Sequence, residues 1–197
     1  HFASNTDAAQ RLKKLGEEVF RIKTVGAPQL DEIHENFKKF KNYKKIFKRH
    51  GIEKINNYSL IIFHPVVEEF KETEKNIKKF IKCLQKTNIE KRIWISPNSD
   101  AGSYTIKSIF LKERNSDDIF FENLPRDEFL TLMSNASAVI GNSSAGLIEA
   151  PSFRIPTINI GRRQKNRVKA KNVINIEEYS DQKLLNAVRR VFSKKFQ

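Results

Sequence analysis

Two serines and a glutamate lie within one short segment whose residue types suit the binding of a phosphate. The segment reads Ile140-Gly141-Asn142-Ser143-Ser144-Ala145-Gly146-Leu147-Ile148-Glu149-Ala150-Pro151. Apolar and small residues precede Gly141, as in a buried strand, and the apolar residues after the serines suit a helix. This order predicts a strand, a turn and a helix N-terminus, where free N–H groups and the helix dipole attract anions. Ser143 and Ser144 would add hydroxyl donors to that site.

The residues of this segment allow two interpretations. In the first, Glu149 lies about one and a half helical turns after the serines and reaches a ribose hydroxyl of the ligand whose phosphate they bind. In the second, Asn142, Ser143 and Ser144 form an ordinary helix cap, because Asn and Ser cap many helices that bind no ligand. The spacing alone leaves both open.

Polar residues also follow other apolar runs, where they could face the same ligand. His64 comes directly after the run 58–63, and its imidazole could hydrogen-bond a phosphate or act as an acid or base near neutral pH. Arg162 and Arg163 follow the run 156–160, where a guanidinium could pair with a diphosphate. Each has a plainer explanation, since single histidines are often structural and arginines are often solvated.

The elements that must position these side chains alternate between strands and helices. Strands are predicted at 19–22, 58–63, 92–96, 119–121, 136–140, 156–160 and 172–176. Helices are predicted at 6–16, 29–49, 68–86, 103–114, 127–134, directly after the turn at Gly141, and at 181–192. This alternation indicates right-handed βαβ crossovers and a mostly parallel sheet. The predicted fold class is therefore a doubly wound α/β domain.

Such a sheet brings the residues that follow its strands to one edge, where ligands bind outside the carboxyl ends of the strands. Five predicted strands are followed directly by polar, glycine or loop residues: His64, Asn98, Leu124, Asn142–Ser144 and Gly161–Arg163. This convergence favours the phosphate interpretation over the plain helix cap. For Asn98 the simpler explanation is turn chemistry beside Asp100 and Gly102.

Composition limits the possible classes of protein. The 197 residues are 39% hydrophobic, which fits one large globular domain. The net charge of +14 suggests nucleic acid, but the lysines at 38–49 alternate with apolar residues as on the solvated face of an amphipathic helix, so no nucleic-acid partner is expected. No apolar run approaches the ~20 residues of a membrane span, and the polar start lacks a signal-peptide core, so no membrane partner is expected.

The cysteine and the histidines of the sequence indicate neither a disulfide nor a metal site. The sequence has one cysteine, Cys83, which excludes a disulfide or thiolate cluster within these residues and falls on the apolar face of a predicted helix. The four histidines are scattered and lack zinc spacing, so no metal is expected. A reducing, cytoplasmic location fits this usage.

Four segments together resemble the hydrolysing UDP-N-acetylglucosamine 2-epimerases. They are residues 141–164, Phe63-His64-Pro65-Val66, Ser96-Pro97-Asn98-Ser99-Asp100-Ala101-Gly102 and Val25-Gly26-Ala27-Pro28. The resemblance covers nearly the whole chain and is closest to the branch that feeds sialic-acid-type sugars. The non-hydrolysing branch typically has Asp-Ser-Gly-Gly and His-Arg-Arg-Glu, where this chain has Asn142-Ser143-Ser144-Ala145 and His64-Pro65-Val66-Val67.

The resemblance implies a two-domain enzyme of the GT-B type, of which this chain is mainly the C-terminal, UDP-binding domain at 25–197. Residues 1–24 would join it to an N-terminal domain that lies outside the sequence and holds the catalytic carboxylates. By the same similarity Ser143 and Ser144 bind the diphosphate and Glu149 the ribose. Asn98, the Leu124 backbone and Arg163 would line the uridine and phosphate site, and His64 would lie near the diphosphate as the catalytic candidate of this domain.

The implied reaction converts UDP-N-acetylglucosamine and water into N-acetylmannosamine and UDP, through elimination of UDP and then hydration. No cofactor is implied, the full-length enzyme is expected to be a homo-oligomer, and this chain alone is expected to bind UDP without turnover. Three alternatives remain: a GT-B glycosyltransferase that uses a UDP-sugar, an epimerase of a UDP-2,4-diacetamido-trideoxy sugar, and a non-enzymatic module that senses nucleotide sugars or binds nucleic acid.

Overall fold

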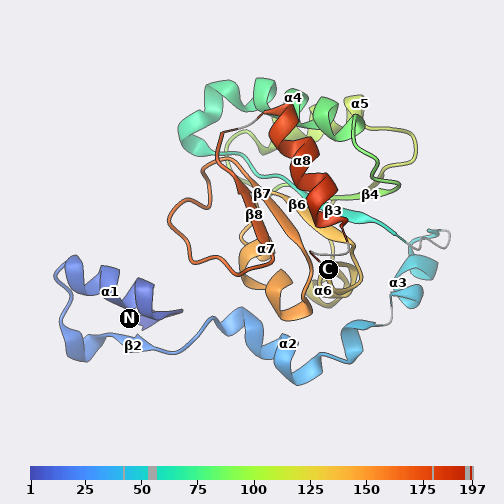
Figure 1. Ribbon diagram of the computed structural model, residues 1–197. Helices are drawn as coiled ribbons and strands as arrows, with labels where there is room; N and C mark the ends of the chain where they lie inside the picture. The colour runs from blue at the N-terminus through green and yellow to red at the C-terminus, as the bar shows by residue number, and fades with distance from the viewer. Residues whose placement is uncertain (42, 53–56, 179, 194–195, 197) are drawn as a thin grey trace. The chain divides into compact units, whose positions relative to one another are not determined.

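The computed structural model describes residues 1–41, 43–52, 57–178, 180–193 and 196 (Figure 1). The chain divides into two compact units, His1–Lys38 and Lys39–Gln197. No helix in the described part of the chain is both long and apolar enough to cross a bilayer.

The first unit contains a small βαβ motif. Its elements are β1 (Phe2–Ala3), α1 (Thr6–Lys14), the 3₁₀ turn η1 (Val19–Arg21), β2 (Lys23–Thr24), the 3₁₀ turn η2 (Pro28–Leu30) and α2 (Asp31–Asn36). The Asn5 side chain caps α1 by accepting a hydrogen bond from the Ala8 N–H at 2.8 Å. β1 and β2 pair in parallel, and Ala3, Ala9 and Ile22 form the core.

Two predicted elements lie wholly within this unit, and one of them is wrong. The helix predicted at 6–16 is confirmed by α1. The strand predicted at 19–22 is instead the 3₁₀ turn η1, and β2 begins after it. The Arg21 N–H donates to the Glu18 carbonyl, and the side chains of Val19 and Phe20 are exposed, so these residues do not pair as a strand and only Ile22 reaches the core.

The second unit is built on one parallel sheet. Its strands are β3 (Ser59–Ile62), β4 (Arg92–Ile95), β5 (Ile119–Phe121), β6 (Ala138–Gly141), β7 (Thr157–Ile160) and β8 (Val173–Ile176). The six strands lie in the order β5-β4-β3-β6-β7-β8, which is the strand order of the Rossmann fold. All six match predicted strands within two residues at each end, and the predicted doubly wound α/β fold is confirmed.

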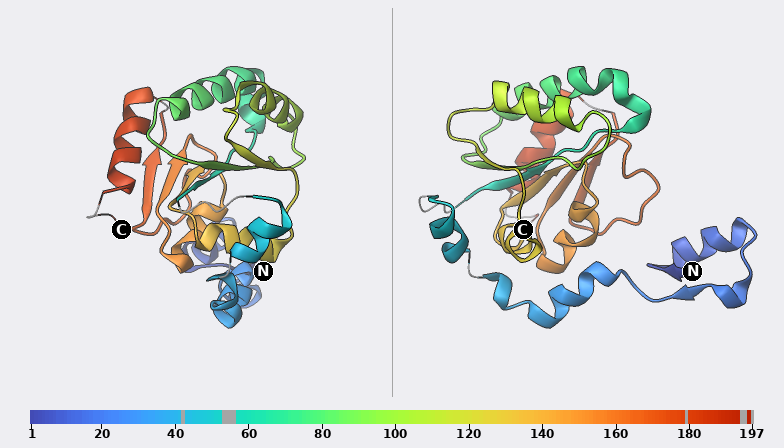
Figure 2. Two further views of the ribbon diagram at one scale, coloured as in Figure 1. Left: turned by 90° about the vertical axis from the view of Figure 1, so that its right-hand side faces the viewer. Right: turned by 180° about the vertical axis from the view of Figure 1, so that it is seen from behind.

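Helices cover both faces of this sheet (Figures 1 and 2). One layer contains α4 (Thr73–Gln85), α5 (Ser103–Glu113) and α8 (Asp181–Val191), and the other contains α6 (Arg126–Ser134) and α7 (Ala145–Ile148). The remaining helical segments are η3 (Lys39–Lys41), α3 (Lys44–Arg49), η4 (Val67–Glu72) and η5 (Ala150–Phe153). Beneath the first layer the ring of Trp94, from β4, packs edge-to-face with Phe80 and at a tilt against Phe110, and Cys83 is buried there as its apolar setting predicts.

Three predicted helices are shorter than expected. The helix predicted at 29–49 is broken into four segments because the boundary between the two units falls within it; residue 42 lies outside the described residues. The helix predicted at 68–86 starts as the 3₁₀ segment η4, where Glu69 leaves helical geometry. The helix after Gly141 ends at Ile148, because Pro151 has no N–H to continue it, and η5 follows.

Candidate functional site

The centre of the sheet contains the point at which a Rossmann-type fold binds ligands. β3 and β6 are neighbours, although two βα units separate them in sequence, and the strand order reverses between them. At such a point the connections leave the sheet toward opposite faces, so a crevice opens at the carboxyl ends of the two strands. His64 follows β3 and Asn142 follows β6, which places both residues at this crevice.

Gly141 allows β6 to approach β3 closely at that point. Its φ is +142°, and a Cβ added to it would lie 1.9 Å from the carbonyl oxygen of Ile62. Any other residue would therefore collide with the backbone of β3. The glycine of the sequence motif is required by strand packing, and it brings the turn after β6 against the segment after β3.

Asn142 ties these segments together and is almost fully buried. Its backbone N–H donates to the Ile62 carbonyl at 3.0 Å. Its side-chain Oδ1 accepts from the His64 N–H at 2.7 Å, and its Nδ2 donates to the His64 carbonyl at 2.8 Å. Its own carbonyl accepts from Arg163 Nη1 at 3.2 Å and from Gln164 Nε2 at 2.9 Å. The strand ends of β3, β6 and β7 thus meet at one residue.

His64 is half-buried with a fixed ring orientation. Its Nδ1 accepts a hydrogen bond from the backbone N–H of Asn98 at 3.1 Å, so in the neutral ring the proton lies on Nε2. Burial, with the positive charge of Arg163 as the second cause, lowers the pKa of His64 to about 4. The imidazole is therefore uncharged at pH 7 and offers an Nε2–H donor.

The two serines of the turn differ in their contacts. Ser143 Oγ accepts from the Ala145 N–H at 3.3 Å, which is the local bond of a helix cap. The Ser144 side chain caps none of the N–H groups of α7. The backbone N–H groups of Ser144 and Gly146 donate to no acceptor within the described residues. A plain helix cap therefore explains Ser143. It leaves three donors without a partner in the described part of the chain: the Ser144 hydroxyl and the backbone N–H groups of Ser144 and Gly146.

Glu149 lies at the joint between α7 and η5 and is buried. Its carboxylate accepts from Arg126 Nη1 at 3.0 Å, which links it to the first residue of α6. Arg126 was not singled out from the sequence, although it begins the helix that follows Leu124. Leu124 is half-buried, and the exposed Asn98 side chain donates to the Asp100 carboxylate.

The two arginines after β7 have different environments. Arg163 is half-buried and contacts the Asn142 carbonyl. Arg162 is exposed and pairs with Glu178, with 3.7 Å between Nη2 and Oε1. Gln164 was also missed from the sequence, and only its place directly after the arginine pair could have indicated it. The structure therefore brings His64, Ser143–Ser144 and Arg163 around Asn142, and the Asn98 N–H contacts the His64 ring. Leu124 follows β5 and Glu149 follows α7.

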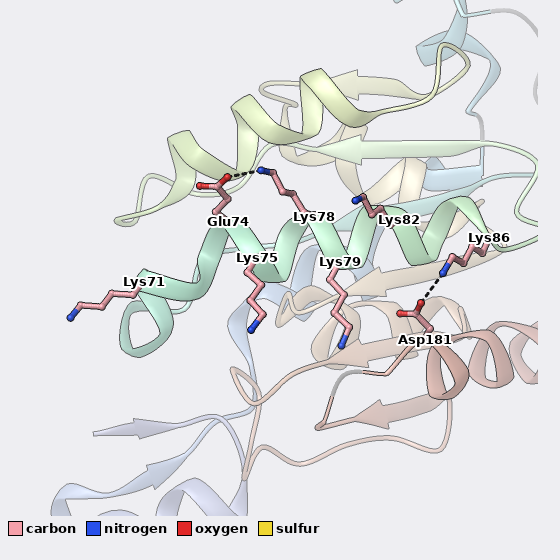
Figure 3. A pocket seen from close by; sticks show the side chains of 8 residues that line it. All are labelled: Lys71, Glu74, Lys75, Lys78, Lys79, Lys82, Lys86 and Asp181. Carbon is pink, nitrogen blue, oxygen red and sulfur yellow. Dashed lines mark hydrogen bonds and ion pairs between the residues drawn. The ribbon is translucent and has the colours of Figure 1, made fainter.

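Two surface pockets differ in their relation to this site. One of about 400 Å³ opens at the strand ends; its lining includes Phe63, Asn142, Gly161, Arg162, Glu69 and Glu177. Another of about 620 Å³ runs along α4 and is lined by six lysines, Glu74 and Asp181 (Figure 3). The first also contains Glu72 and Glu178 and touches the site only through Asn142, while the second contains no residue that directly follows a strand of the sheet. The candidate site is therefore defined by the strand ends of β3 and β6 and their hydrogen bonds, not by either pocket.

Comparison with known proteins gives one family over the full sequence. Residues 1–197 match the family described as UDP-N-acetylglucosamine 2-epimerase. A Legionella pneumophila UDP-N,N'-diacetylbacillosamine 2-epimerase (hydrolyzing) is 33% identical over 98% of this chain and 51% of its own length. A Campylobacter jejuni GDP/UDP-N,N'-diacetylbacillosamine 2-epimerase (hydrolyzing) is 36% identical over 90% of this chain and 46% of its own.

The solved structures confirm the fold. The Methanocaldococcus jannaschii UDP-GlcNAc 2-epimerase in complex with UDP-GlcNAc and UDP superposes with a TM-score of 0.75 at 24% identity, over 100% of this chain and 55% of that one. This chain spans about half the length of the curated relatives it matches. The resemblance seen in the sequence motifs is confirmed, and the chain belongs to the UDP-N-acetylglucosamine 2-epimerase family.

Proposed function

We propose that this chain supplies the UDP-binding half of a hydrolysing UDP-N-acetylglucosamine 2-epimerase. The observation that carries the proposal is the meeting of His64, the Ser143–Ser144 turn and Arg163 around Asn142, where the strand order reverses. These residues offer hydrogen-bond donors and one positive charge at a single crevice. A diphosphate is the ligand that such a set of donors suits.

Each proposed contact follows from the donors and acceptors of the site. The Ser144 hydroxyl, the N–H groups of Ser144 and Gly146, the Arg163 guanidinium and the His64 Nε2–H would bind the diphosphate oxygens, with Ser143 beside them. Glu149, held by Arg126, would accept from the ribose hydroxyls. Asn98 and the backbone of Leu124 would line the uridine.

The proposed reaction begins with elimination. A base removes the proton on C2 of the sugar, the C1–C2 double bond forms, and the electron pair of the C1–O bond leaves with UDP. Water then adds across the double bond of the 2-acetamidoglucal and gives N-acetylmannosamine. Negative charge builds up on the departing diphosphate, so donors fixed around it lower the barrier. We assign the base to the other half of the enzyme and the leaving group to this half.

The first unit has features expected of a segment that packs against the other half of the enzyme. Its core has three buried residues, while Phe2, Leu15, Val19 and Phe20 are all more than 60% exposed. A two-stranded sheet of this size has marginal stability alone, so the unit gains from packing these apolar side chains against a neighbour. We propose that residues 1–24 complete a larger parallel sheet, whose other strands belong to the N-terminal domain of the same enzyme.

The sugar of the substrate has two candidates. N-acetylglucosamine is the first, and a 2,4-diacetamido-trideoxy sugar is favoured by the names of the Legionella and Campylobacter relatives. Rates of the full-length protein with both UDP-sugars distinguish them. A glycosyltransferase would instead need an acceptor and would release no free 2-acetamido-mannose sugar.

Calorimetry with the 197-residue chain tests the nucleotide site. We expect one UDP per chain and weaker binding of UMP, because UMP lacks one of the two phosphates that the turn and Arg163 would contact. Equal affinities for UDP and UMP, or no binding of UDP, would contradict the proposal. Release of N-acetylmannosamine by this chain alone would contradict the assignment of the base to the other half.

A further inference from the structure

Asn142 is buried where three strand ends meet, and its backbone and side-chain groups are all used within the protein. We propose that Asn142 is a positioning residue, which holds the backbone of His64 and the guanidinium of Arg163 so that both face the crevice. This inference rests on the proposed function for its ligand. It assigns to Asn142 a role different from that of the serines, because all its polar groups already have protein partners.

The Asn142 side chain extends the hydrogen-bonding ladder between β3 and β6 beyond its last backbone pair. The register pairs Ile62 with Gly141, and the Asn142 N–H still donates to the Ile62 carbonyl. One step further, the primary amide of Asn142 both accepts from and donates to the backbone of His64. A side-chain amide has the same donor and acceptor as a peptide group, so it replaces one more ladder pair after the strands have diverged.

This bond fixes the base of the His64 side chain, and a second bond fixes its ring. Nδ1 is held by the N–H of Asn98, from the segment after β4. Two constraints from two neighbouring strand ends leave the imidazole little rotational freedom. The charged groups that face the ring are Arg163, from the segment after β7, and Asp100, from the segment after β4.

The carbonyl of Asn142 fixes the other donor of the site. Arg163 Nη1 and Gln164 Nε2 both donate to it, at 3.2 and 2.9 Å. A guanidinium at the end of a flexible side chain is thereby held near enough to the His64 ring to lower its pKa. Its remaining N–H groups donate to no acceptor in the part of the chain that the structure describes. The position of Asn142 therefore determines the relative placement of the two donors.

The test is the His64 titration in the Asn142→Ala variant, followed by NMR of the imidazole protons without nucleotide. Loss of both bonds from the Asn142 side chain to the His64 backbone removes one of the two constraints on the ring, which should then move away from its buried position beside Arg163. The pKa of His64, about 4 in the wild type, should rise toward the ordinary value of about 6.5. Affinity for UDP should fall about ten-fold or more. A folded variant with an unchanged His64 pKa would overturn the proposal.

Asn159→Ala is the matched control. Asn159 is an equally buried amide on the neighbouring strand β7, and its Nδ2 donates to Asn175 rather than to the His64 segment. Its loss should lower the melting temperature without moving the pKa of His64. A pKa shift of the same size in both variants would overturn the proposal, because it would reflect general loosening of the sheet.

A measurement on the wild type covers the case in which Asn142→Ala does not fold. The backbone N–H of His64 should exchange its hydrogen slowly with solvent, because Asn142 Oδ1 accepts a hydrogen bond from it. Exchange as fast as that of an exposed loop amide would overturn the proposal. The His64 titration and the hydrogen exchange both need no nucleotide. If both give the expected result but the chain does not bind UDP, only the proposed function is contradicted.

Discussion

At the scale of single residues, the protonation state of His64 decides what the candidate site can contribute to the proposed reaction. A ring with a pKa of about 4, lowered by burial and by Arg163, is uncharged at pH 7 and carries its single ring proton on Nε2. A neutral imidazole is better suited to donate a hydrogen bond to a diphosphate than to act as an acid or a base. The proposed division between a leaving-group half and a proton-transfer half follows from this state.

The same state makes the stability of the chain depend on pH. Unfolded His64 binds a proton below pH ~6.5, but the folded ring does not until about pH 4, so the folded state loses stability as the pH falls through this window. We expect the free energy of unfolding of the wild type to fall by up to about 3 kcal/mol more than that of His64→Gln between pH 7 and pH 4. Urea titrations at several pH values measure this difference, and parallel curves would contradict it.

Substitutions of Ser144 and Ser180 test whether a serine at a helix start binds a phosphate or only caps the helix. Ser180 Oγ accepts from the Lys183 N–H at 3.1 Å and is a plain cap of α8. Ser180→Ala should lower the free energy of unfolding by about 1 kcal/mol and leave UDP affinity unchanged. Ser144 caps no N–H of α7, so Ser144→Ala should weaken UDP binding about ten-fold or more with little loss of stability. The reverse pattern in calorimetry and denaturation would contradict the phosphate site.

At the scale of elements, α4 and the residues just beyond its two ends carry a row of lysines. Lys71, Lys75, Lys78, Lys79, Lys82 and Lys86 line one pocket (Figure 3), and several of them are three or four residues apart. Like charges at these spacings repel along a helix. Two ion pairs offset this repulsion, Lys78 with Glu74 and Lys86 with Asp181.

Lys75→Glu measures this repulsion. The new carboxylate would lie three or four residues from Lys71, Lys78 and Lys79, so the free energy of unfolding should rise by about 0.5 to 1 kcal/mol at low salt. Lys75→Gln, which only removes the charge, should give roughly half of this gain. In 1 M salt the differences should nearly vanish. A loss of stability in Lys75→Glu at low salt would contradict this explanation of the lysine face.

At the scale of the whole molecule, the sheet could be predicted from the sequence because its central strands are buried on both faces and appear as short apolar runs, such as Leu60–Ile62. Convergence of the polar residues at one edge followed from that topology. What could not be predicted depends on contacts distant in sequence. Arg126 reaches Glu149 only through folding, and the break in the helix predicted at 29–49 reflects a boundary between units rather than any local signal.

The most direct test of the central claim is a UDP titration of this chain that is followed by amide NMR. If the strand ends at the reversal point bind the diphosphate, the largest shifts should be those of Ser144, Gly146 and His64, and they should saturate together at one UDP per chain. Shifts confined to the lysines of α4, or no saturable shifts at all, would contradict it.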